Sequence, residues 1–153
     1  MTQRYKIPVS VLVLIHTPEL DVLLLERADR PGFWQSVTGS IEHAGEALPA
    51  TVEREVREET GLEAGAYRVT DWRRENRYRI YPRWRSRYAP GIVRNAEHVF
   101  SMEVPGRLPV RLAPQEHLAY EWLPWQAAVE RVFSWTNADA IRELPLRRSA
   151  LTA

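Results

Sequence analysis

Two runs of residues, separated by seven positions, decide the fold. They are Gly39-Ser40-Ile41-Glu42-His43-Ala44-Gly45-Glu46 and Arg54-Glu55-Val56-Arg57-Glu58-Glu59-Thr60-Gly61-Leu62. The first run has glycine near each end, which is typical of a loop. Pro49 suits the first turn of a helix, and Gly61 suits the left-handed position after its last turn. A helix is therefore predicted from about residue 49 to residue 60.

Three carboxylates fall on one face of this helix. Glu55, Glu58 and Glu59 stand at positions i, i+3 and i+4, which places their Cβ atoms roughly 5–6 Å apart. The apolar stripe of Val52 and Val56 adjoins them, so the acids are expected at the edge of the core, where solvation is reduced. Like charges this close repel one another unless a cation stands among them. Oxygen ligands select a hard cation, Mg²⁺ or Mn²⁺; the alternative interpretation is a solvated, salt-bridged helix face.

Apolar runs on either side of this helix predict a sheet. Residues 9–15 and 22–25 are short and continuously apolar, which indicates strands buried on both faces and hence a sheet covered by helices. Further strands are predicted over residues 35–38, 99–104 and 118–123. Two C-terminal helices follow, one with Pro124 in its first turn and one capped near Thr136 or Asn137. Residues 73–91 lack a clean period and contain two prolines, which favours a long excursion or an irregular hairpin.

The composition excludes several classes of protein. The chain of 153 residues is 44% apolar and 27% charged, which predicts one domain over residues 1–153 with a sizeable core. It contains no cysteine, so disulfides, thiolate metal sites and cysteine nucleophiles are excluded. The apolar run at residues 9–15 is too short to span a bilayer and has no cleavage site after it, so a cytoplasmic protein is expected. P-loop and nucleophile-elbow motifs are absent from the sequence.

The net charge of +1 is the sum of two opposite blocks. Residues 42–63 hold seven acids and two arginines, a net charge of −5, whereas residues 73–94 hold eight arginines and one glutamate, a net charge of +7. Overall near-neutrality argues against a nucleic acid or a membrane as partner. The segregation suggests instead that both blocks face one small anionic substrate. Five arginines could form an electropositive wall for a triphosphate or, alternatively, a solvated surface: Arg77, Arg79, Arg83, Arg85 and Arg87.

The two quoted runs resemble the Nudix box, a glycine, five residues, a glutamate and seven residues before Arg-Glu-apolar-x-Glu-Glu-x-Gly-apolar. Nine defined positions match, with one departure: six residues, not five, separate Gly39 from Glu46, as though one were inserted near His43 and Ala44. The resemblance implies an α/β fold of the Nudix type, an α/β/α sandwich around a mixed β-sheet. It also implies a hydrolase that depends on Mg²⁺, with Mn²⁺ as the other candidate.

Segments outside the box extend the resemblance to one branch of the family. They are Phe33-Trp34-Gln35-Ser36-Val37-Thr38-Gly39, Arg87-Tyr88-Ala89-Pro90-Gly91, Glu116-His117-Leu118-Ala119-Tyr120 and Ser134-Trp135-Thr136-Asn137. They are similar to bacterial dihydroneopterin triphosphate pyrophosphatases, which implies hydrolysis of that triphosphate to the monophosphate and pyrophosphate in folate biosynthesis. The alternatives are a broader Nudix nucleoside triphosphate pyrophosphatase and a non-catalytic Nudix-like binding module. No obligate protein partner is evident from the sequence.

The resemblance also implies roles for individual residues. The metal ligands would be Glu55, Glu58, Glu59 and Glu116. Arg54 would belong to the catalytic set, with either Glu58 or Glu116 as the general base that takes a proton from metal-bound water. Substrate contacts would come from Lys6, Arg27, Thr38, Tyr78, Arg79, Ile80, Tyr81, Glu116 and Ser134. Trp34 and Tyr88 could stack on a pterin, although a role in the core is favoured for each.

Overall fold

The structure is a computed structural model that describes residues 4–152, the side chains of residues 149–152 excepted. Its elements are, in chain order, β1 (Val9–His16), β2 (Asp21–Arg27), β3 (Trp34–Gln35), β4 (Val37–Ser40), α1 (Leu48–Thr60), the 3₁₀ turn η1 (Ala64–Ala66), β5 (Arg68–Arg79), the 3₁₀ turn η2 (Pro82–Arg87), β6 (Arg94–Glu103), β7 (His117–Pro124), α2 (Trp125–Arg131) and α3 (Trp135–Thr152). Within the described residues the seven strands form one sheet of order β3-β2-β1-β6-β5, with β4 paired to β1 and β7 paired to β2. The pairing of β1 with β6 is parallel and the other pairings are antiparallel, so the expected mixed sheet is confirmed.

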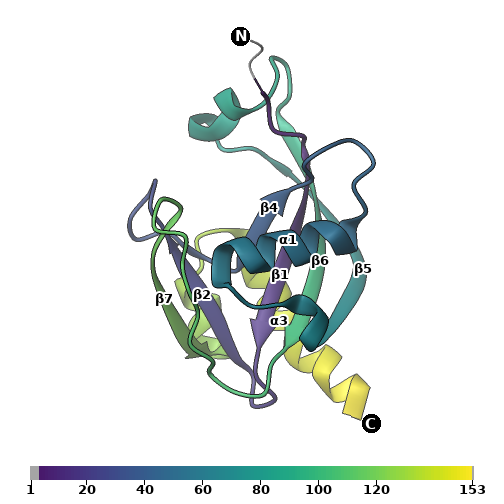
Figure 1. Cartoon of the computed structure of the whole chain (residues 1–153), viewed down its shortest axis with the longest axis vertical. Helices are drawn as coiled ribbons and strands as arrows, with labels where there is room; N and C mark the ends of the chain where they lie inside the picture. Colours follow the sequence, from purple (N-terminus) through teal and green to yellow (C-terminus); the bar gives the residue numbers. More distant parts are fainter. Residues whose placement is uncertain (1–3, 153) are drawn as a thin grey trace.

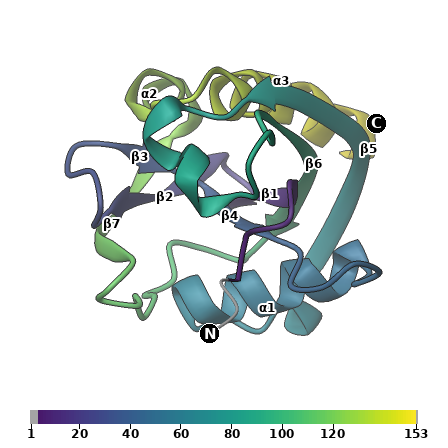
Figure 2. The same ribbon diagram turned by 90° about the horizontal axis from the view of Figure 1, so that it is seen from above.

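Helices cover both faces of this sheet. Helix α1 lies on one face, and α2 and α3 lie on the other, as Figures 1 and 2 show from two directions. Alternate residues of β1 point into two separate cores: Val11 and Val13 pack with α1, whereas Leu12 and Leu14 pack with α3. The expected α/β/α sandwich is therefore confirmed, and the buried apolar strands are its central layer.

Helix α1 begins and ends where its sequence indicates. Proline lies in the first turn, after Ala47 in an extended conformation, and Gly61 follows the last turn with φ +76°. The Gly61 N–H donates to the carbonyl of Arg57 at 2.9 Å, which satisfies one of the free carbonyl groups of the last turn. The prediction for residues 49–60 is confirmed to within one residue.

Residues 73–91 belong to an irregular hairpin, one of the two alternatives predicted for them. Residues up to Arg79 belong to β5, an edge strand of twelve residues that pairs with β6 only. A register shift between Asp71 and Glu75 interrupts this strand, and Arg73 within it has φ +52°. This bulge interrupts the alternation of apolar and polar residues that marks a strand in a sequence. The many arginines of this exposed edge strand weaken the pattern further. Residues 80–91, which include η2, form the irregular connection of this hairpin.

The strand predicted over residues 35–38 is divided in two. The Ser36 N–H donates to the Oδ1 atom of Asn137 at 2.8 Å rather than to a neighbouring strand, so β3 and β4 separate at this residue.

Among the described residues, no helix has the length and apolar character required to cross a membrane.

Candidate active site

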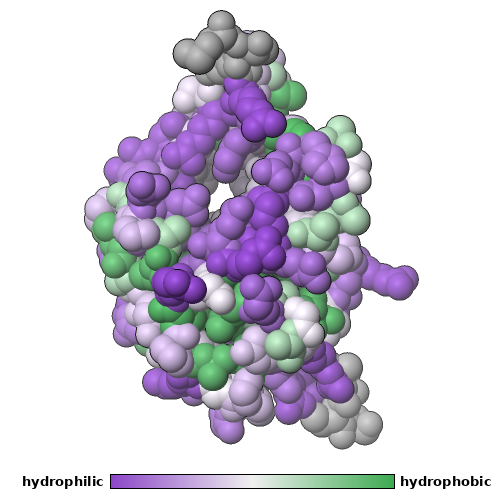
Figure 3. Space-filling model, in the orientation of Figure 1, coloured by the Kyte–Doolittle hydropathy of each residue, from purple (hydrophilic) through white to green (hydrophobic). Residues whose placement is uncertain are grey.

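A cavity of about 570 Å³ opens beside α1, and hydrophilic side chains surround its mouth (Figure 3). It is lined from both helix layers and from the strand ends between them. All the residues to which the resemblance gave a metal-binding, catalytic or substrate-contacting role line it: Lys6, Arg27, Thr38, Arg54, Glu55, Glu58, Glu59, Tyr78, Arg79, Ile80, Tyr81, Glu116 and Ser134. The structure thus brings these residues together from seven separate segments of the chain.

The three acids of α1 lie at different depths in this cavity. Glu55 and Glu59 are buried, with 9% and 2% of their surfaces exposed, whereas the Glu58 side chain is half exposed. A rotation of about 100° per residue turns i and i+4 toward the sheet and leaves i+3 at the rim. The prediction that all three carboxylates sit at the core edge is therefore right for two of them, and Glu58 lies at the cavity mouth.

Glu55 and Glu59 form a hydrogen-bonded pair of buried carboxyl groups. Burial raises the pKa of Glu59 well above its usual range, and the adjacent Glu55 and then Glu116 raise it further. Burial also raises the pKa of Glu55, against the opposing effects of Glu59 and Arg54. The backbone of Thr38 is hydrogen-bonded to Glu59, yet the Glu59 Oε1 atom has no partner at all. An incompletely paired carboxylate in this position is costly and indicates a ligand.

Arg54 holds the loop before α1 against the acids. Its guanidinium donates to Glu55 at 2.7 Å, to Glu46 at 2.9 and 3.3 Å, and to the Ser40 carbonyl at 3.0 Å. The Glu46 Oε1 atom also accepts from the Glu42 N–H at 2.9 Å, so the extra residue of this loop does not displace Glu46. Gly45, with φ +100°, provides the left-handed conformation that the longer loop requires.

This network makes a testable contribution to stability. We expect Arg54→Ala to lower the free energy of unfolding at pH 7 by about 3 kcal/mol, because Glu46 and Glu55 would lose their shared cation. Arg54 lowers the pKa of Glu46 to about 2, so its stabilisation is present above pH 4.5 and is lost as the pH falls toward 2. Urea unfolding at pH 7 and at pH 3 should therefore show a smaller difference between variant and parent at the lower pH.

The matched control is Arg57→Ala, since Arg57 is an exposed arginine of the same helix. It should change the free energy of unfolding by no more than about 0.5 kcal/mol. Equal losses in the two variants would mean that helix charge, and not the Arg54 network, is responsible.

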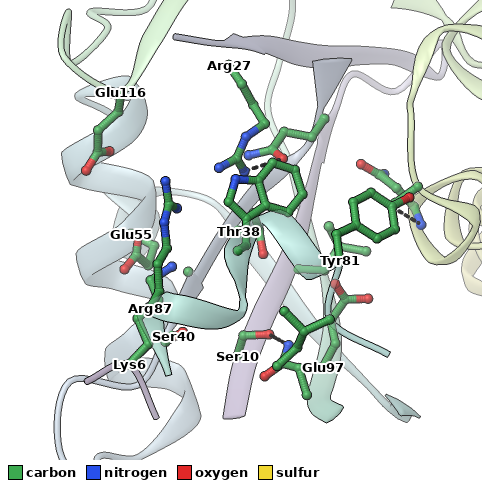
Figure 4. Close-up of a pocket in the computed structure, with 18 of the residues that line it drawn as sticks. Lys6, Ser10, Arg27, Thr38, Ser40, Glu55, Tyr81, Arg87, Glu97 and Glu116 are labelled. Carbon is green, nitrogen blue, oxygen red and sulfur yellow. Dashed lines mark hydrogen bonds between the residues drawn. The ribbon is translucent and has the colours of Figure 1, made fainter. Parts of the chain in front are cut away.

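Glu116 faces the α1 acids from the start of β7 (Figure 4). It is exposed, and its charge contributes to the raised pKa of Glu59. The next residue, His117, is buried with its Nε2 atom 3.7 Å from Glu59 Oε1. Burial and then Arg27 lower the pKa of His117 to about 4, so it is neutral at pH 7 and the contact is not an ion pair.

The acids fit a divalent cation, although they do not form a closed cage. Among the described residues, no three acidic or histidine side chains converge on one point as ligands around an ion do. The buried Glu55–Glu59 pair nevertheless concentrates oxygen ligands where negative charge lacks compensation, and Glu59 Oε1 is unpaired. Glu58 and Glu116 are exposed on either side and line the same cavity. This donor set suits a hard cation and offers nothing to a soft one.

Basic side chains occupy the middle of the cavity. Arg27 donates to Asp29 at 2.7 and 2.8 Å and to Gln35 at 3.1 Å, and its guanidinium lies 4.4 Å from the Trp84 ring centre. Arg87 also donates to Asp29, at 2.8 Å. Hydrogen bonds from the Arg27 side chain lower the pKa of Asp29 first, with Arg87 adding to the effect. Asp29 thus fixes two arginines beside the position where a polyphosphate would meet the acids.

Lys6 lies next to this arginine pair. Desolvation in the cavity and then the charge of Arg87 lower its pKa, whereas Glu55 and Glu59 act in the opposite direction. The Lys6 backbone N–H donates to the Arg87 carbonyl at 2.8 Å, which places the lysine on the same wall as η2.

Only two members of the predicted arginine wall line the cavity, Arg79 and Arg87. Arg77, Arg83 and Arg85 do not line it, so the structure favours the alternative of an arginine-rich surface for these three.

The remaining predicted residues have identifiable local roles. The Thr38 hydroxyl donates to the Val11 carbonyl at 2.9 Å, and the Ser134 hydroxyl accepts from the Asn137 N–H at 3.2 Å, as a helix cap does. Tyr81 stacks on Trp84 with ring centres 5.4 Å apart. Tyr88 lines the cavity, whereas Trp34 packs with the core beneath α2 and α3, as favoured for it.

Sequence reasoning missed a second group of lining residues. Asp29, Trp84, Asn95 and Glu97 all line the cavity. Asp29 follows a strand and Trp84 lies in an irregular segment, so neither gave a periodic signal. Glu97 gave a weak one, since it is an acid at a position of β6 that faces inward.

Comparison with known proteins gives consistent results. Residues 6–144 match the NUDIX domain family. The chain is 43% identical over 142 residues to dihydroneopterin triphosphate diphosphatase of Escherichia coli, with 91% of this chain and 93% of that protein covered. It is 39% identical to the protein of the same name from Haemophilus influenzae, with 94% and 90% covered. The solved structure of the E. coli dihydroneopterin triphosphate pyrophosphohydrolase superposes with a TM-score of 0.86 at 42% identity, covering 92% of this chain and 97% of that one.

Proposed function

This chain belongs to the Nudix family of hydrolases, and from that premise we propose that it hydrolyses dihydroneopterin triphosphate to dihydroneopterin monophosphate and pyrophosphate in folate biosynthesis. The observation that supports this substrate most is identity of 43% over 91% of the chain to an enzyme named for it. The cavity adds to this support, because it has acids at one side and arginines beside them. An isolated binding module would have no need of the buried Glu55–Glu59 pair.

We assign Mg²⁺ as the cofactor, with Glu55 and Glu59 as buried ligands and with Glu58 and Glu116 completing the set from the rim. When bound there, the ion would shield the phosphate charge, activate a water and stabilise the departing pyrophosphate. Arg54 keeps Glu55 oriented toward the cavity through its 2.7 Å hydrogen bond. Arg27, Arg87 and Lys6 bind the phosphate oxygens and align the chain of phosphates.

The general base is Glu58 or Glu116 in this proposal. Both are exposed carboxylates at the cavity mouth, so either is able to accept a proton from water and release it to solvent. Glu59 is less suited to this role, because its raised pKa reflects burial that only a bound cation relieves. We further propose that residues 1–153 form a single domain and that the protein is cytoplasmic. Its partner in this proposal is the small substrate and not a nucleic acid.

The substrate assignment has a direct test. Pyrophosphate release should be measured with dihydroneopterin triphosphate, dATP and other nucleoside triphosphates at equal Mg²⁺ concentration. We expect kcat/KM for the pterin to exceed that for dATP by at least about tenfold, since a difference of 1.4 kcal/mol in transition-state binding produces that ratio. A preference for nucleotides would overturn the pterin assignment and leave the Nudix hydrolase assignment intact.

A further inference from the structure

A polar patch occupies the end of the sheet face that α3 begins to cover. We define the patch as Ser10, Asn76, Asn95 and Glu97. The strand register places Glu97 on β6 opposite Ser10 of β1 and opposite Asn76 of β5. All four residues are buried, with between 2% and 7% of their surfaces exposed. Farther along the same face the residues are apolar and pack under α3, so the patch departs from the core pattern.

Two acceptor atoms and one donor atom of this patch have no hydrogen-bond partner, and the donor, Asn76 Nδ2, belongs to a residue that does not line the cavity. Glu97 Oε1 and Asn95 Oδ1 are buried and without hydrogen bonds, and both residues line the cavity. The amide of Asn95 is already used, since its Nδ2 atom donates to Ser10 at 2.7 Å and to Tyr78 at 3.1 Å. Burial raises the pKa of Glu97, and the adjacent Thr136 and Asn76 offset only part of the effect. A carboxylate left in this state lowers stability, which favours a role in binding over one in folding.

The patch lies apart from the acids that would hold the metal. In Figure 4, Glu97 and Tyr81 lie on one side of the cavity, and Glu55 and Glu116 lie on the other, with Thr38 between them. Arg27 lies between the two sides, whereas Arg87 lies beside Lys6 and Glu55. A triphosphate that reaches the acids therefore extends its organic group toward Glu97 and the stacked rings of Tyr81 and Trp84.

Unpartnered acceptors require a ligand that brings donors. A flat ring with a 2-amino group beside a ring N–H presents two adjacent donors, which a carboxylate binds in a bidentate manner. The pterin ring has this edge, guanine shares it, and adenine lacks it. Resting on the function proposed above, we propose that Glu97 is the residue that selects the substrate ring, by accepting hydrogen bonds from its 2-amino and ring N–H groups.

The test compares the hydrolysis of triphosphates that differ in the organic ring they carry or that carry none. Glu97→Gln should lower kcat/KM for dihydroneopterin triphosphate and for GTP by about ten- to a hundredfold, the effect of removing a charged acceptor. Hydrolysis of ATP and of inorganic tripolyphosphate should change by less than about twofold, since neither presents two adjacent donors. The unfolding temperature without metal should equal or exceed that of the parent, because a buried acid is removed.

The matched control is Glu103→Gln on the same strand. Glu103 pairs with Arg148 outside the cavity, so all four substrates should be hydrolysed at the parental rate. Fluorescence titration with neopterin, which has no phosphate, supplies a measurement independent of turnover: Glu97→Gln should weaken ring binding by the same factor.

Two results would overturn the inference. One is an equal loss on all four substrates, tripolyphosphate included, which would make Glu97 a structural residue. The other is unchanged ring binding and unchanged discrimination in the variant. A parent enzyme that prefers GTP to the pterin would refute the substrate proposed above, whereas a selective loss on GTP in Glu97→Gln would still support ring selection by Glu97.

Discussion

Glu59→Gln is expected to lower kcat by about a thousandfold at saturating Mg²⁺, because loss of one metal ligand forfeits about 4 kcal/mol of charge stabilisation at the phosphate. Glutamine has nearly the same shape as glutamate and keeps an oxygen that accepts from the Thr38 backbone. The variant therefore removes the charge and preserves the packing. Pyrophosphate release over a range of Mg²⁺ concentrations is the measurement.

The same variant should be more stable than the parent when metal is removed by a chelator. The pKa of Glu59 is raised in the folded protein, so the folded state binds more protons than the unfolded state at pH values above the usual 4.5. Stability contributed by the protonated form is consequently lost as the pH rises from about 4.5 through the raised folded pKa. Glutamine does not titrate, so thermal unfolding of the variant should depend less on pH in this window.

Glu53→Gln is the matched control, since Glu53 is an exposed acid of the same helix. Its turnover and its stability should remain close to those of the parent. Full activity in Glu59→Gln would remove Glu59 from the metal site, whereas lost activity combined with lowered stability would indicate damage to the fold.

The sequence predicted most of the fold because its signals are local. Pro49 and Gly61 fix the ends of α1, and continuous apolar runs mark β1 and β2. The bounds of strand β5 were not predicted, because an edge strand with a bulge near Arg73 shows no regular alternation. Only pairing with β6 in the folded chain determines its conformation.

The site was predictable to a similar extent and for a similar reason. The acids of α1 follow from helix spacing, and the resemblance supplied the distant residues that line the same cavity. The polar patch had only the weak signal of Glu97, because Glu97 and Asn95 meet Ser10 only through the parallel pairing of β6 with β1. Parallel neighbours are far apart in sequence, so contacts between them leave no local pattern.

Gly39→Ala is expected to cause the second largest loss of kcat. The cause is steric overlap of the added methyl group and not a change in backbone conformation. Gly39 lies in β4, directly against the carboxylate of Glu55, and an added Cβ would overlap that carboxylate. Glu55 is the first acid of the buried pair and is held from its other side by Arg54. The methyl group therefore has to push the carboxylate out of position, because the strand that carries residue 39 is fixed by pairing with β1.

A ligand displaced by about 1 Å lowers turnover roughly a hundredfold. Gly39→Ala should accordingly reduce kcat by about this factor and require more Mg²⁺ for half-maximal rate, while the unfolding temperature changes little, since only the end of a flexible side chain moves. Gly65→Ala provides the control, because a Cβ at Gly65 meets no atom within 4 Å. Parental kcat and Mg²⁺ dependence in Gly39→Ala would show that Glu55 is not held in place for metal binding. A strongly lowered unfolding temperature would show that the strand had moved instead of the carboxylate.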